Sequence, residues 1–392
     1  MPKFAQNPTD VRFVQDPYPA YDRMRALGPL VYWQDYALPC TTSFAATNAV
    51  LRDRRFGRVP LEPPTIPPHL APFYAIEAHS MLELEPPRHT RLRGLVLRAF
   101  TSRRIAALAP EIDALAHGLI DTLPGDEFDL LEHFARPLPV IIIARLLGVP
   151  ESMTADLLRW SNAMVGMYQA GRSRAMEDAA AVAATEFSAF LRDYIDARRA
   201  RPADDLVTHL IAAEEDGQTL STEEMIATCI LLLNAGHEAT VHSLGLAVKT
   251  LLQHGLWPAP ITDALVEECL RYDPALHLFT RWAYDDIDVM GVTIPRGAQL
   301  ACLLGAANRC PRQWDQPNKF DPTRPAKPHT GFGAGLHFCL GAPLARLELQ
   351  RALSVLGARL PRLTLAAPPQ LADIYHFHGL ERLIVAQGTP SP

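Results

Sequence analysis

Cysteine is scarce in this chain, and its cysteines are scattered. There are six in 392 residues, and no two of them form a C-x-x-C pair, so a zinc knuckle or an iron–sulfur cluster has no framework. Six are also too few for a disulfide scaffold in a chain of this length. The ordinary role is that of a small buried apolar residue, and Cys229 and Cys269 fit it because each falls within a helical pattern. Cys339 does not, because it lies in a glycine-rich loop.

Long apolar runs and a surplus of basic residues are also missing. No run reaches the roughly 18 residues that a transmembrane helix needs, and the first residues lack the apolar core of a signal peptide. Lys and Arg number 37 against 43 Asp and Glu, and the resulting formal charge of −6 disfavours a nucleic-acid binder. With 48% hydrophobic and 20% charged residues the composition is globular. We therefore expect a cytoplasmic protein that binds neither nucleic acid nor a membrane.

Helical periodicity dominates the chain. Ser102–Ile120 is amphipathic but is divided by Pro110, and Ala175–Arg199 has apolar residues at helical spacing. Val140–Ile143 has strand propensity, yet it continues into a helical pattern that Gly148 would end, so we predict a buried helix.

The longest predicted helix begins at Ser221, which forms a capping box with Glu224, and continues to about Leu252. Gly236 lies in its middle, where glycine costs about 1 kcal/mol relative to alanine, so close packing or a local distortion is expected. Strand signals are few: Leu30–Trp33 with a possible return strand, a hairpin over Ile287–Gly297, and a short strand over Arg382–Ala386. We predict a single mainly α domain over residues 1–392 with a minor β portion.

The most informative segment is the glycine-rich loop that contains Cys339, namely Gly331-Phe-Gly-Ala-Gly-Leu-His-Phe-Cys-Leu-Gly341. Leucines at helical spacing follow it, which puts Cys339 at the entrance of a helix, where unpaired N–H groups and the helix dipole stabilise an anion. A thiolate there has a lowered pKa and is a good metal ligand or nucleophile. A dinucleotide-binding interpretation lacks the preceding strand, and a cysteine-hydrolase interpretation lacks an identified histidine base.

This loop resembles the haem-thiolate loop of the cytochrome P450 family. The shared pattern F-G-x-G-x-H-x-C-x-G consists of Phe332, Gly333, Gly335, His337, Cys339 and Gly341. Three further stretches resemble the family and extend the similarity over nearly the whole chain: Glu85–Arg93, Asn234–Thr240 and Glu268–Arg271. The opening Asp16–Tyr21 resembles soluble bacterial members. The resemblance implies the cytochrome P450 fold, with haem between a long central helix and the cysteine loop.

The resemblance also implies roles around haem b, which is iron protoporphyrin IX. Cys339 would be the axial ligand of the iron, because a thiolate pushes electron density onto the metal and favours cleavage of the O–O bond. Phe332 would pack near the proximal face of the ring, and Gly333 and Gly341 would allow the backbone to approach it.

The two haem propionates would need buried cations, and the family's positions for them map to His89, Arg93, Arg281 and His337. His89 and Arg93 are four residues apart, so they share one face of a helix. Arginine also has the fork geometry that suits a carboxylate.

Behind the haem, the resemblance implies a structural pair of Glu268 and Arg271. A basic residue from the later loop joins this pair in the family, and either Lys319 or Arg324 could take that place.

On the long helix, the resemblance implies that Ala235 and Gly236 open a groove for dioxygen and that Glu238 is the acid of a proton relay. The family usually has threonine directly after this acid, whereas this chain has Ala239. Thr240 is about 100° further round the helix and should not simply replace it. We therefore expect a substrate hydroxyl or an additional water to supply the missing group; alternatively, peroxide serves as the oxidant.

The implied substrate pocket is mainly apolar, as ligand sites usually are. Its candidate lining residues are Phe73, Met167, Leu232, Leu278 and Phe377. His79, His277 and His376 lie in or near the same segments and could orient a polar group, or they could equally be core or surface histidines.

The function implied is that of a monooxygenase, which inserts one oxygen atom of dioxygen into a mainly apolar small organic substrate. Electrons would come from NAD(P)H through a separate ferredoxin or flavodoxin and its reductase. A basic docking surface could be formed by Arg88, Arg91, Arg98, Arg103, Arg104, Arg312 and Arg346. The alternatives are a peroxide-driven peroxygenase or non-oxidative haem-thiolate enzyme, and a haem-binding sensor without turnover.

Overall fold

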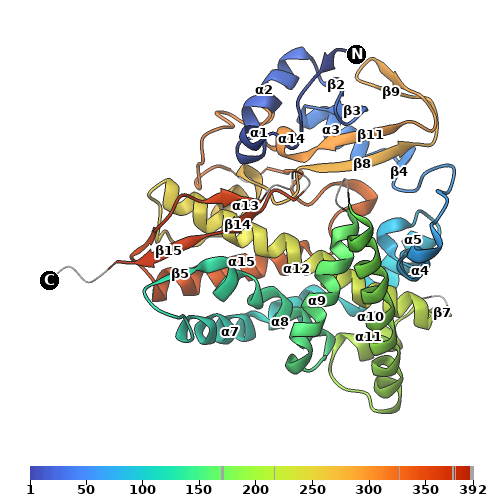
Figure 1. The fold of residues 1–392 in the computed structure, drawn as a ribbon, viewed down its shortest axis with the longest axis vertical. Coiled ribbons are helices and arrows are strands. Elements are labelled where there is room, and N and C mark those ends of the chain that lie inside the picture. Colours follow the sequence, from blue (N-terminus) through green and yellow to red (C-terminus); the bar gives the residue numbers. More distant parts are fainter. Residues whose placement is uncertain (169–171, 216, 326, 373–374, 376, 389–392) are drawn as a thin grey trace. The chain divides into compact units, whose positions relative to one another are not determined.

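A computed structural model describes residues 1–168, 172–215, 217–325, 327–372, 375 and 377–388 of the chain. Helices predominate and the strands form small sheets, which confirms the predicted mainly α fold with a minor β portion (Figure 1). The chain divides into two compact units: unit 1 contains residues 1–61, 112–136 and 239–392, and unit 2 contains residues 62–111 and 137–238. The single domain expected over residues 1–392 stays a prediction. His376 lies outside the described residues.

The main sheet of unit 1 has the strand order β1-β2-β3-β11-β8-β4. Its strands are β1 (Lys3–Phe4), β2 (Leu30–Trp33), β3 (Leu38–Thr41), β4 (Phe56–Gly57), β8 (Leu278–Ala283) and β11 (Gln299–Leu303). The smaller sheets pair β9 (Ile287–Val289) with β10 (Val292–Ile294), β13 (Gln370–Leu371) with β14 (Leu380–Arg382), and β15 (Ile384–Gln387) with β5 (Glu127–Asp129) and β12 (Leu363–Leu365). The return strand after Trp33 and the hairpin after Ile287 are thereby confirmed. The single strand predicted over Arg382–Ala386 is instead divided at Leu383 between β14 and β15, which belong to different sheets.

Alternation along β11 explains why the main sheet is buried on both faces. Ala301 and Leu303 join a core cluster with Tyr21 and other residues of α2 (Tyr18–Leu27). Leu300 and Cys302 point to the opposite face and join a second cluster with residues of α3 (Phe44–Arg52). The other helical elements of unit 1 are α1 (Val11–Gln15), most of α7 (Ala109–Asp121), η3 (Leu131–Ala135), α13 (Asp263–Tyr272), α14 (Leu304–Asn308), η6 (Gly335–His337) and α15 (Ala342–Arg359).

Unit 2 is almost entirely helical. It contains η1 (Pro68–Leu70), α4 (Ala71–Glu77), η2 (Met81–Glu83), α5 (Arg88–Ala99), α6 (Ser102–Ala107), α8 (Pro137–Leu147), η4 (Glu151–Met153), α9 (Thr154–Val165), η5 (Gly166–Tyr168), α10 (Arg174–Ala200) and α11 (Leu206–Ala212), with the short strands β6 (Glu214–Glu215) and β7 (Gln218–Thr219). The predicted break near Pro110 is real. It falls at Leu108, because proline is accepted in the first turn of α7. Gly148 ends α8 with a φ of +80°, as expected of a glycine after a helix.

The long helix α12 (Thr222–Gln253) has residues in both units. Its capping box is formed as predicted: the backbone N–H of Glu224 donates to Ser221 Oγ at 3.2 Å, and the N–H of Ser221 donates to the Glu224 carboxylate at 3.0 Å. Gly236 is explained by close packing, since a Cβ at this position would lie 2.6 Å from Cδ1 of Ile143 on α8. Within the described residues, no helix combines the length and the apolar character that crossing a membrane requires.

Candidate functional site

The cysteine loop of unit 1 is a tight backbone turn that holds Cys339 in front of α15. The N–H of Gly333 donates to the Thr330 carbonyl at 2.8 Å, and the N–H of Cys339 donates back to the Phe332 carbonyl at 3.0 Å. Gly333 and Gly335 have φ angles of +70° and +71°, which L side chains rarely adopt. A Cβ on Gly335 would also collide with the Leu51 carbonyl, so the loop lies directly on the end of α3.

Cys339 differs from the other five cysteines in exposure. Those five are buried, whereas Cys339 is partly exposed. Burial raises the pKa of Cys40 and Cys229 to about 12 and that of Cys302 to about 11, so these thiols stay protonated and inert. Among the cysteines described, Cys339 is therefore the one whose surface is accessible to a ligand.

The start of α15 suits an anion beside Cys339. No side chain caps the helix, whose N-cap is Gly341 and whose second residue is Pro343. The first N–H groups of a helix have no partners within it and form the positive end of its dipole. A Cβ on Gly341 would lie 3.9 Å from Cys339 Sγ, so this glycine is adjacent to the sulfur. The location predicted for Cys339 at a helix entrance is thus confirmed.

Phe332 is held behind the loop by Arg346 of α15. The guanidinium carbon lies 4.6 Å from the centroid of the Phe332 ring, and Nη2 donates to Glu267 at 3.0 Å. Glu267 also contacts Nε2 of His329 at 3.2 Å. Burial alone would raise the pKa of Glu267, but its bonds to His329 and Arg346 lower it to about 2. The ring of Phe332 packs against a small core of Val266, Leu270 and Leu349.

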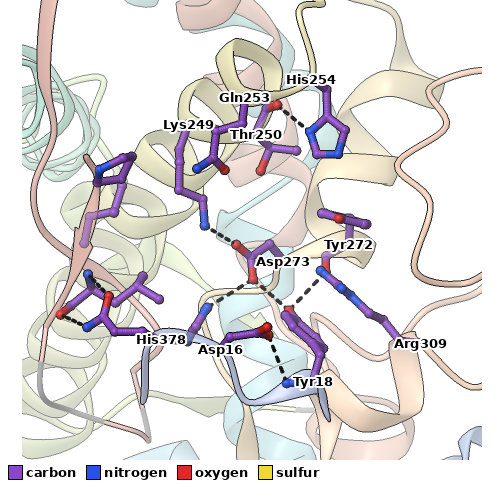
Figure 2. A pocket seen from close by; sticks show the side chains of 14 residues that line it. Asp16, Tyr18, Lys249, Thr250, Gln253, His254, Tyr272, Asp273, Arg309 and His378 are labelled. Atoms are coloured by element: carbon purple, nitrogen blue, oxygen red, sulfur yellow. Dashed lines mark hydrogen bonds and ion pairs between the residues drawn. The ribbon is translucent and has the colours of Figure 1, made fainter. Parts of the chain in front are cut away.

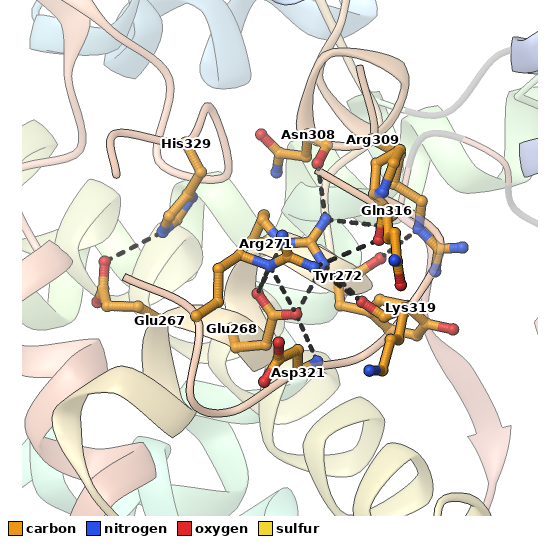
Figure 3. A network of polar contacts seen from close by, with 12 residues as sticks. Glu267, Glu268, Arg271, Tyr272, Asn308, Arg309, Gln316, Lys319, Asp321 and His329 are labelled. Atoms are coloured by element: carbon orange, nitrogen blue, oxygen red, sulfur yellow. Dashed lines mark hydrogen bonds and ion pairs between the residues drawn. The ribbon is translucent and has the colours of Figure 1, made fainter. Parts of the chain in front are cut away.

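Glu268 and Arg271 form the expected structural pair, buried beneath the loop that follows α14 (Figure 3). Their side chains are 3% and 1% exposed, and they share two hydrogen bonds, Nε to Oε2 at 2.7 Å and Nη2 to Oε1 at 2.8 Å. Arg271 Nη1 also donates to the Asn308 carbonyl at 2.9 Å. The third partner is Arg324, whose Nε lies 3.4 Å from the carboxylate. Lys319 supplies only its backbone carbonyl, which accepts from Arg271 at 3.4 Å.

Of the four expected propionate ligands, His89 and Arg93 share one helix as predicted, whereas the strand that contains Arg281 was not predicted. His89 and Arg93 are both on α5 of unit 2, and His89 is 1% exposed. In unit 1, Arg281 is buried on β8 and donates from Nη1 to the Thr280 carbonyl at 2.8 Å. His337 lies in η6, immediately before the cysteine. That these four residues bind the haem propionates stays a prediction.

Of the catalytic candidates on α12, Glu238 and Thr240 have polar side chains, whereas Ala235, Gly236 and Ala239 do not. The side chain of Glu238 is 28% exposed, and its Oε2 lies 3.7 Å from Nδ1 of the neighbouring His237. Ala239 has no hydroxyl and Thr240 is buried. Ala235 is exposed within its unit.

The proposed pocket residues are divided between the units. Phe73 and Met167 are buried in unit 2, and Leu232 is half-buried there. In unit 1, Leu278 is buried at the start of β8, and Phe377 forms a β-bridge with Leu276.

The sequence did not predict a polar cleft of about 270 Å³ in unit 1 (Figure 2). At its centre Asp273 accepts from Lys249 Nζ at 2.6 Å and from the Tyr18 hydroxyl at 2.7 Å. Its Oδ1 lies 3.1 Å from Nε2 of His378. Burial alone would raise the pKa of Asp273, but Lys249 and His378 hold it well below the usual range. The signal available in the sequence was an aspartate directly after a helix, a pattern too common to single out.

Asp273, His277 and His378 have donor atoms within 4.8 Å of one another, a spacing that could accommodate a metal ion. However, Lys249 is ion-paired with the aspartate. The guanidinium of Arg309 is nearby and sandwiched between two rings, 3.3 Å from the Tyr18 centroid and 3.8 Å from the Tyr272 centroid. These two cations already neutralise the carboxylate, so the arrangement is an ion-pair network and not a metal centre.

Comparison with known proteins agrees with this geometry. The family model described as Cytochrome P450 matches residues 258–360. The "Biotin biosynthesis cytochrome P450" of Bacillus subtilis (strain 168) is 36% identical, over 97% of this chain and 98% of its own length. The chain belongs to the cytochrome P450 family.

Further relatives support the same family and the same chemistry. The "Cytochrome P450 monooxygenase PikC" of Streptomyces venezuelae is 37% identical over 91% of this chain and 87% of its own. The crystal structure of P450BioI in complex with an acyl carrier protein ligated to hexadec-9Z-enoic acid has a TM-score of 0.91 and 35% identity, over 96% of this chain and 99% of that one. The chain is therefore a haem-containing P450 monooxygenase, an oxidoreductase that acts on an organic substrate with dioxygen and redox partners.

The residues of this P450 fit haem by their donor chemistry. A partly exposed thiol stands at an uncapped helix start, which favours its ionised form. Gly333 and Gly335, the two glycines with positive φ, have no side chains that would obstruct a flat group beside the loop. The buried Arg281 lies on β8. The same strand contains Phe279, and a Cβ on Gly333 would lie 3.3 Å from the Phe279 ring, so the cysteine loop lies against this strand.

Proposed function

We propose that Cys339 is the axial thiolate ligand of the haem iron in this P450. The observation that carries the proposal is the partly exposed position of this one thiol at the uncapped start of α15. Hydrogen bonding from free N–H groups lowers the basicity of a thiolate and stabilises it. Haem held in this way supplies the activation of dioxygen for insertion of one oxygen atom into the substrate.

Replacement of Cys339 tests the assignment. Cys339→Ser should bind haem but lose the red-shifted ferrous carbonyl band that thiolate ligation produces. Cys310→Ser, at a buried cysteine elsewhere in unit 1, should keep that band. Retention of the band in Cys339→Ser would overturn the assignment.

We assign the haem propionates to His89 and Arg93 of α5 and to Arg281 and His337. Burial of His89 and Arg281 supports the assignment, because water would screen a carboxylate only weakly from a cation placed in the interior. Arg281→Gln should lower the haem content of the purified protein, whereas Arg281→Lys should retain part of it. Equal haem content in both variants and the wild type would exclude Arg281.

The residues of α12 are proposed to deliver protons and to leave room for dioxygen. The Glu238 carboxylate is partly exposed, so it can exchange protons with water and pass them inward. Gly236 and Ala235 leave little side-chain bulk on the helix beside it. The methyl of Ala239 can neither donate nor accept a hydrogen bond, so the family's hydroxyl has to come from the substrate or from a water.

The substrate is proposed to be a mainly apolar small organic molecule. Apolar side chains at Phe73, Met167, Leu232, Leu278 and Phe377 support this class. A screen of hexadec-9Z-enoic acid, a steroid and a monocyclic terpene for the low-to-high-spin optical shift would test it. Binding of only small, strongly polar ligands would contradict it.

Electrons are proposed to come from NAD(P)H through a ferredoxin or flavodoxin and its reductase. The exposed arginines of α5 and α6 support an acidic partner. Reduction of the holoenzyme by a generic ferredoxin system, measured by stopped flow, is the test, and a failure with every such system would contradict it.

A second function, peroxide-driven oxygenation, is favoured by Ala239 alone. Product formed with hydrogen peroxide, compared with product formed through a ferredoxin system, distinguishes the two routes. No turnover by either route would instead favour a haem-binding sensor.

A further inference from the structure

A chain of buried polar side chains in unit 1 links the segment after α13 to the loop between β13 and β14. We call it the histidine network; it consists of Tyr21, Asp273, His277, Tyr375 and His378. Nε2 of His378 lies 3.1 Å from Asp273, and Nδ1 of His277 lies 2.8 Å from the Tyr21 hydroxyl. The Tyr21 hydroxyl is in turn 2.7 Å from the Tyr375 hydroxyl. All five residues are buried.

The two histidine rings complete the chain by a tilted ring contact. Their centroids are 4.2 Å apart with an interplanar angle of 30°. Desolvation, together with the nearby charge of His378, lowers the pKa of His277 well below its usual value, so His277 is neutral. A neutral His277 ring can contact His378, which is bonded to the Asp273 carboxylate, without placing two positive charges together.

The His277 ring is fixed by its surroundings. A Cβ at Gly305 would lie 2.8 Å from its Nδ1, so the backbone of α14 lies directly against the ring. The His277 ring is therefore held in place where the His378 ring contacts it.

The backbone also brings the same two segments together. The N–H of His378 donates to the Ala275 carbonyl at 2.8 Å, and Leu276 and Phe377 form an isolated bridge. The N–H of Ala372 donates to the Gly379 carbonyl at 2.8 Å, next to the pair of Leu371 and Leu380 in the β13–β14 ladder. The buried side-chain network adds polar contacts to this backbone pairing.

We propose that the histidine network is a positioning device for substrate selection, which holds Phe377 in a fixed place relative to the segment that leads into Leu278. This rests on the proposed function, in which Phe377 and Leu278 line the substrate pocket. Asp273, His277 and His378 are thus positioning residues, because they act through the two apolar side chains and do not touch the substrate themselves.

His378 offers a matched set of variants. His378→Phe keeps an aromatic ring on His277 but removes the bond to Asp273, whereas His378→Gln keeps a donor for that bond. The control is His254→Phe, because His254 lines the same cleft, its Nδ1 bonds to the Thr250 carbonyl of α12, and a phenyl ring can keep its contacts with Tyr272 and Phe320. Tyr375→Phe, which removes one hydroxyl from the network, is the second variant if His378→Phe does not fold.

The measurement is the dissociation constant of each holoenzyme for hexadec-9Z-enoic acid, a steroid and a monocyclic terpene, read from the spin-state shift. Imidazole, which is small and binds the iron directly, serves as the reference ligand. In His378→Phe we expect the ratios between the three constants to change by about tenfold, the size of one lost buried hydrogen bond, with the imidazole constant unchanged. His378→Gln should restore the ratios, and His254→Phe should leave them as in the wild type.

Two results would overturn the proposal. One is an equal weakening of all ligands including imidazole, which a general loss of stability would produce. The other is unchanged ratios in both His378→Phe and Tyr375→Phe. A wild-type protein without the thiolate-type carbonyl band would instead overturn the proposed function, so the two failures are distinguishable.

Discussion

Arg324 Nε lies 3.4 Å from the carboxylate of Glu268, a residue 56 positions earlier in the chain. The same carboxylate accepts the backbone N–H of Asp321 at 2.8 Å. Arg324 also donates to carbonyls of its own loop, including that of Asp315. One side chain therefore fastens the proline-rich loop after α14 to the buried Glu268–Arg271 pair.

We predict that Arg324→Met lowers the free energy of unfolding of the holoenzyme by about 1–2 kcal/mol, because one donor is lost from a buried carboxylate that keeps Arg271. Lys319→Ala should cost almost nothing, since this exposed side chain does not contact Glu268. Denaturant titration followed by the Soret band measures both. A larger loss in Lys319→Ala than in Arg324→Met would contradict the assignment of the third partner.

The sequence predicted the longer helices and the cysteine loop, because their signals are local, but it did not predict β8 or β11 of the main sheet. The capping box at Ser221, the glycine after α8 and the glycine pattern around Cys339 each lie within a few residues. The choice between Lys319 and Arg324 could not be made, because both side chains are long enough and only the path of an irregular loop decides between them. The histidine network was missed for the same reason, since Tyr21 and Tyr375 are 354 residues apart.

Because Glu348 on α15 is buried, we predict that the free energy of unfolding falls as the pH rises. Glu348 is 2% exposed, its Oε1 has no hydrogen-bond partner among the described residues, and burial raises its pKa from 4.5 to about 8. Between pH 4.5 and about pH 8, the carboxyl group of Glu348 is ionised in the unfolded chain and protonated in the folded chain. Stability should therefore fall by ~1.4 kcal/mol for each pH unit over this window and level off above it.

Glu348→Gln removes this titration while keeping the shape of the side chain. The free energy of unfolding of the variant minus that of the wild type should rise with pH from about 5 to about 8. Asp53→Asn is the control, because Arg55 holds the pKa of Asp53 below its usual value and its difference should be flat over the same range. A flat difference for Glu348→Gln as well would show that its carboxylate is ionised in the folded protein.

Ala239→Thr tests whether the site has a substitute for the missing hydroxyl. If a substrate hydroxyl or a water already fills the role, product formed per NADH consumed should change by less than about threefold, or ~0.7 kcal/mol of barrier height. The measurement uses a generic ferredoxin system and a ligand that gives the spin-state shift. A large rise in coupling would mean that the natural enzyme has no substitute, and peroxide-driven activity would then become the favoured function.

The arginines of the proposed docking surface are not equivalent. Arg91 and Arg346 are half-buried and form ion pairs with Glu224 and Glu267, so they are less accessible to a partner. Arg88, Arg98 and Arg103 are exposed on α5 and α6. Reversing these three to Glu should slow reduction by an acidic ferredoxin about tenfold at low salt, and the difference should vanish near ~1 M salt, where the Debye length is about 3 Å. Arg201→Glu, at an exposed arginine beyond the end of α10, should leave the rate unchanged. Equal salt dependence in the triple variant and the wild type would place the electron donor elsewhere.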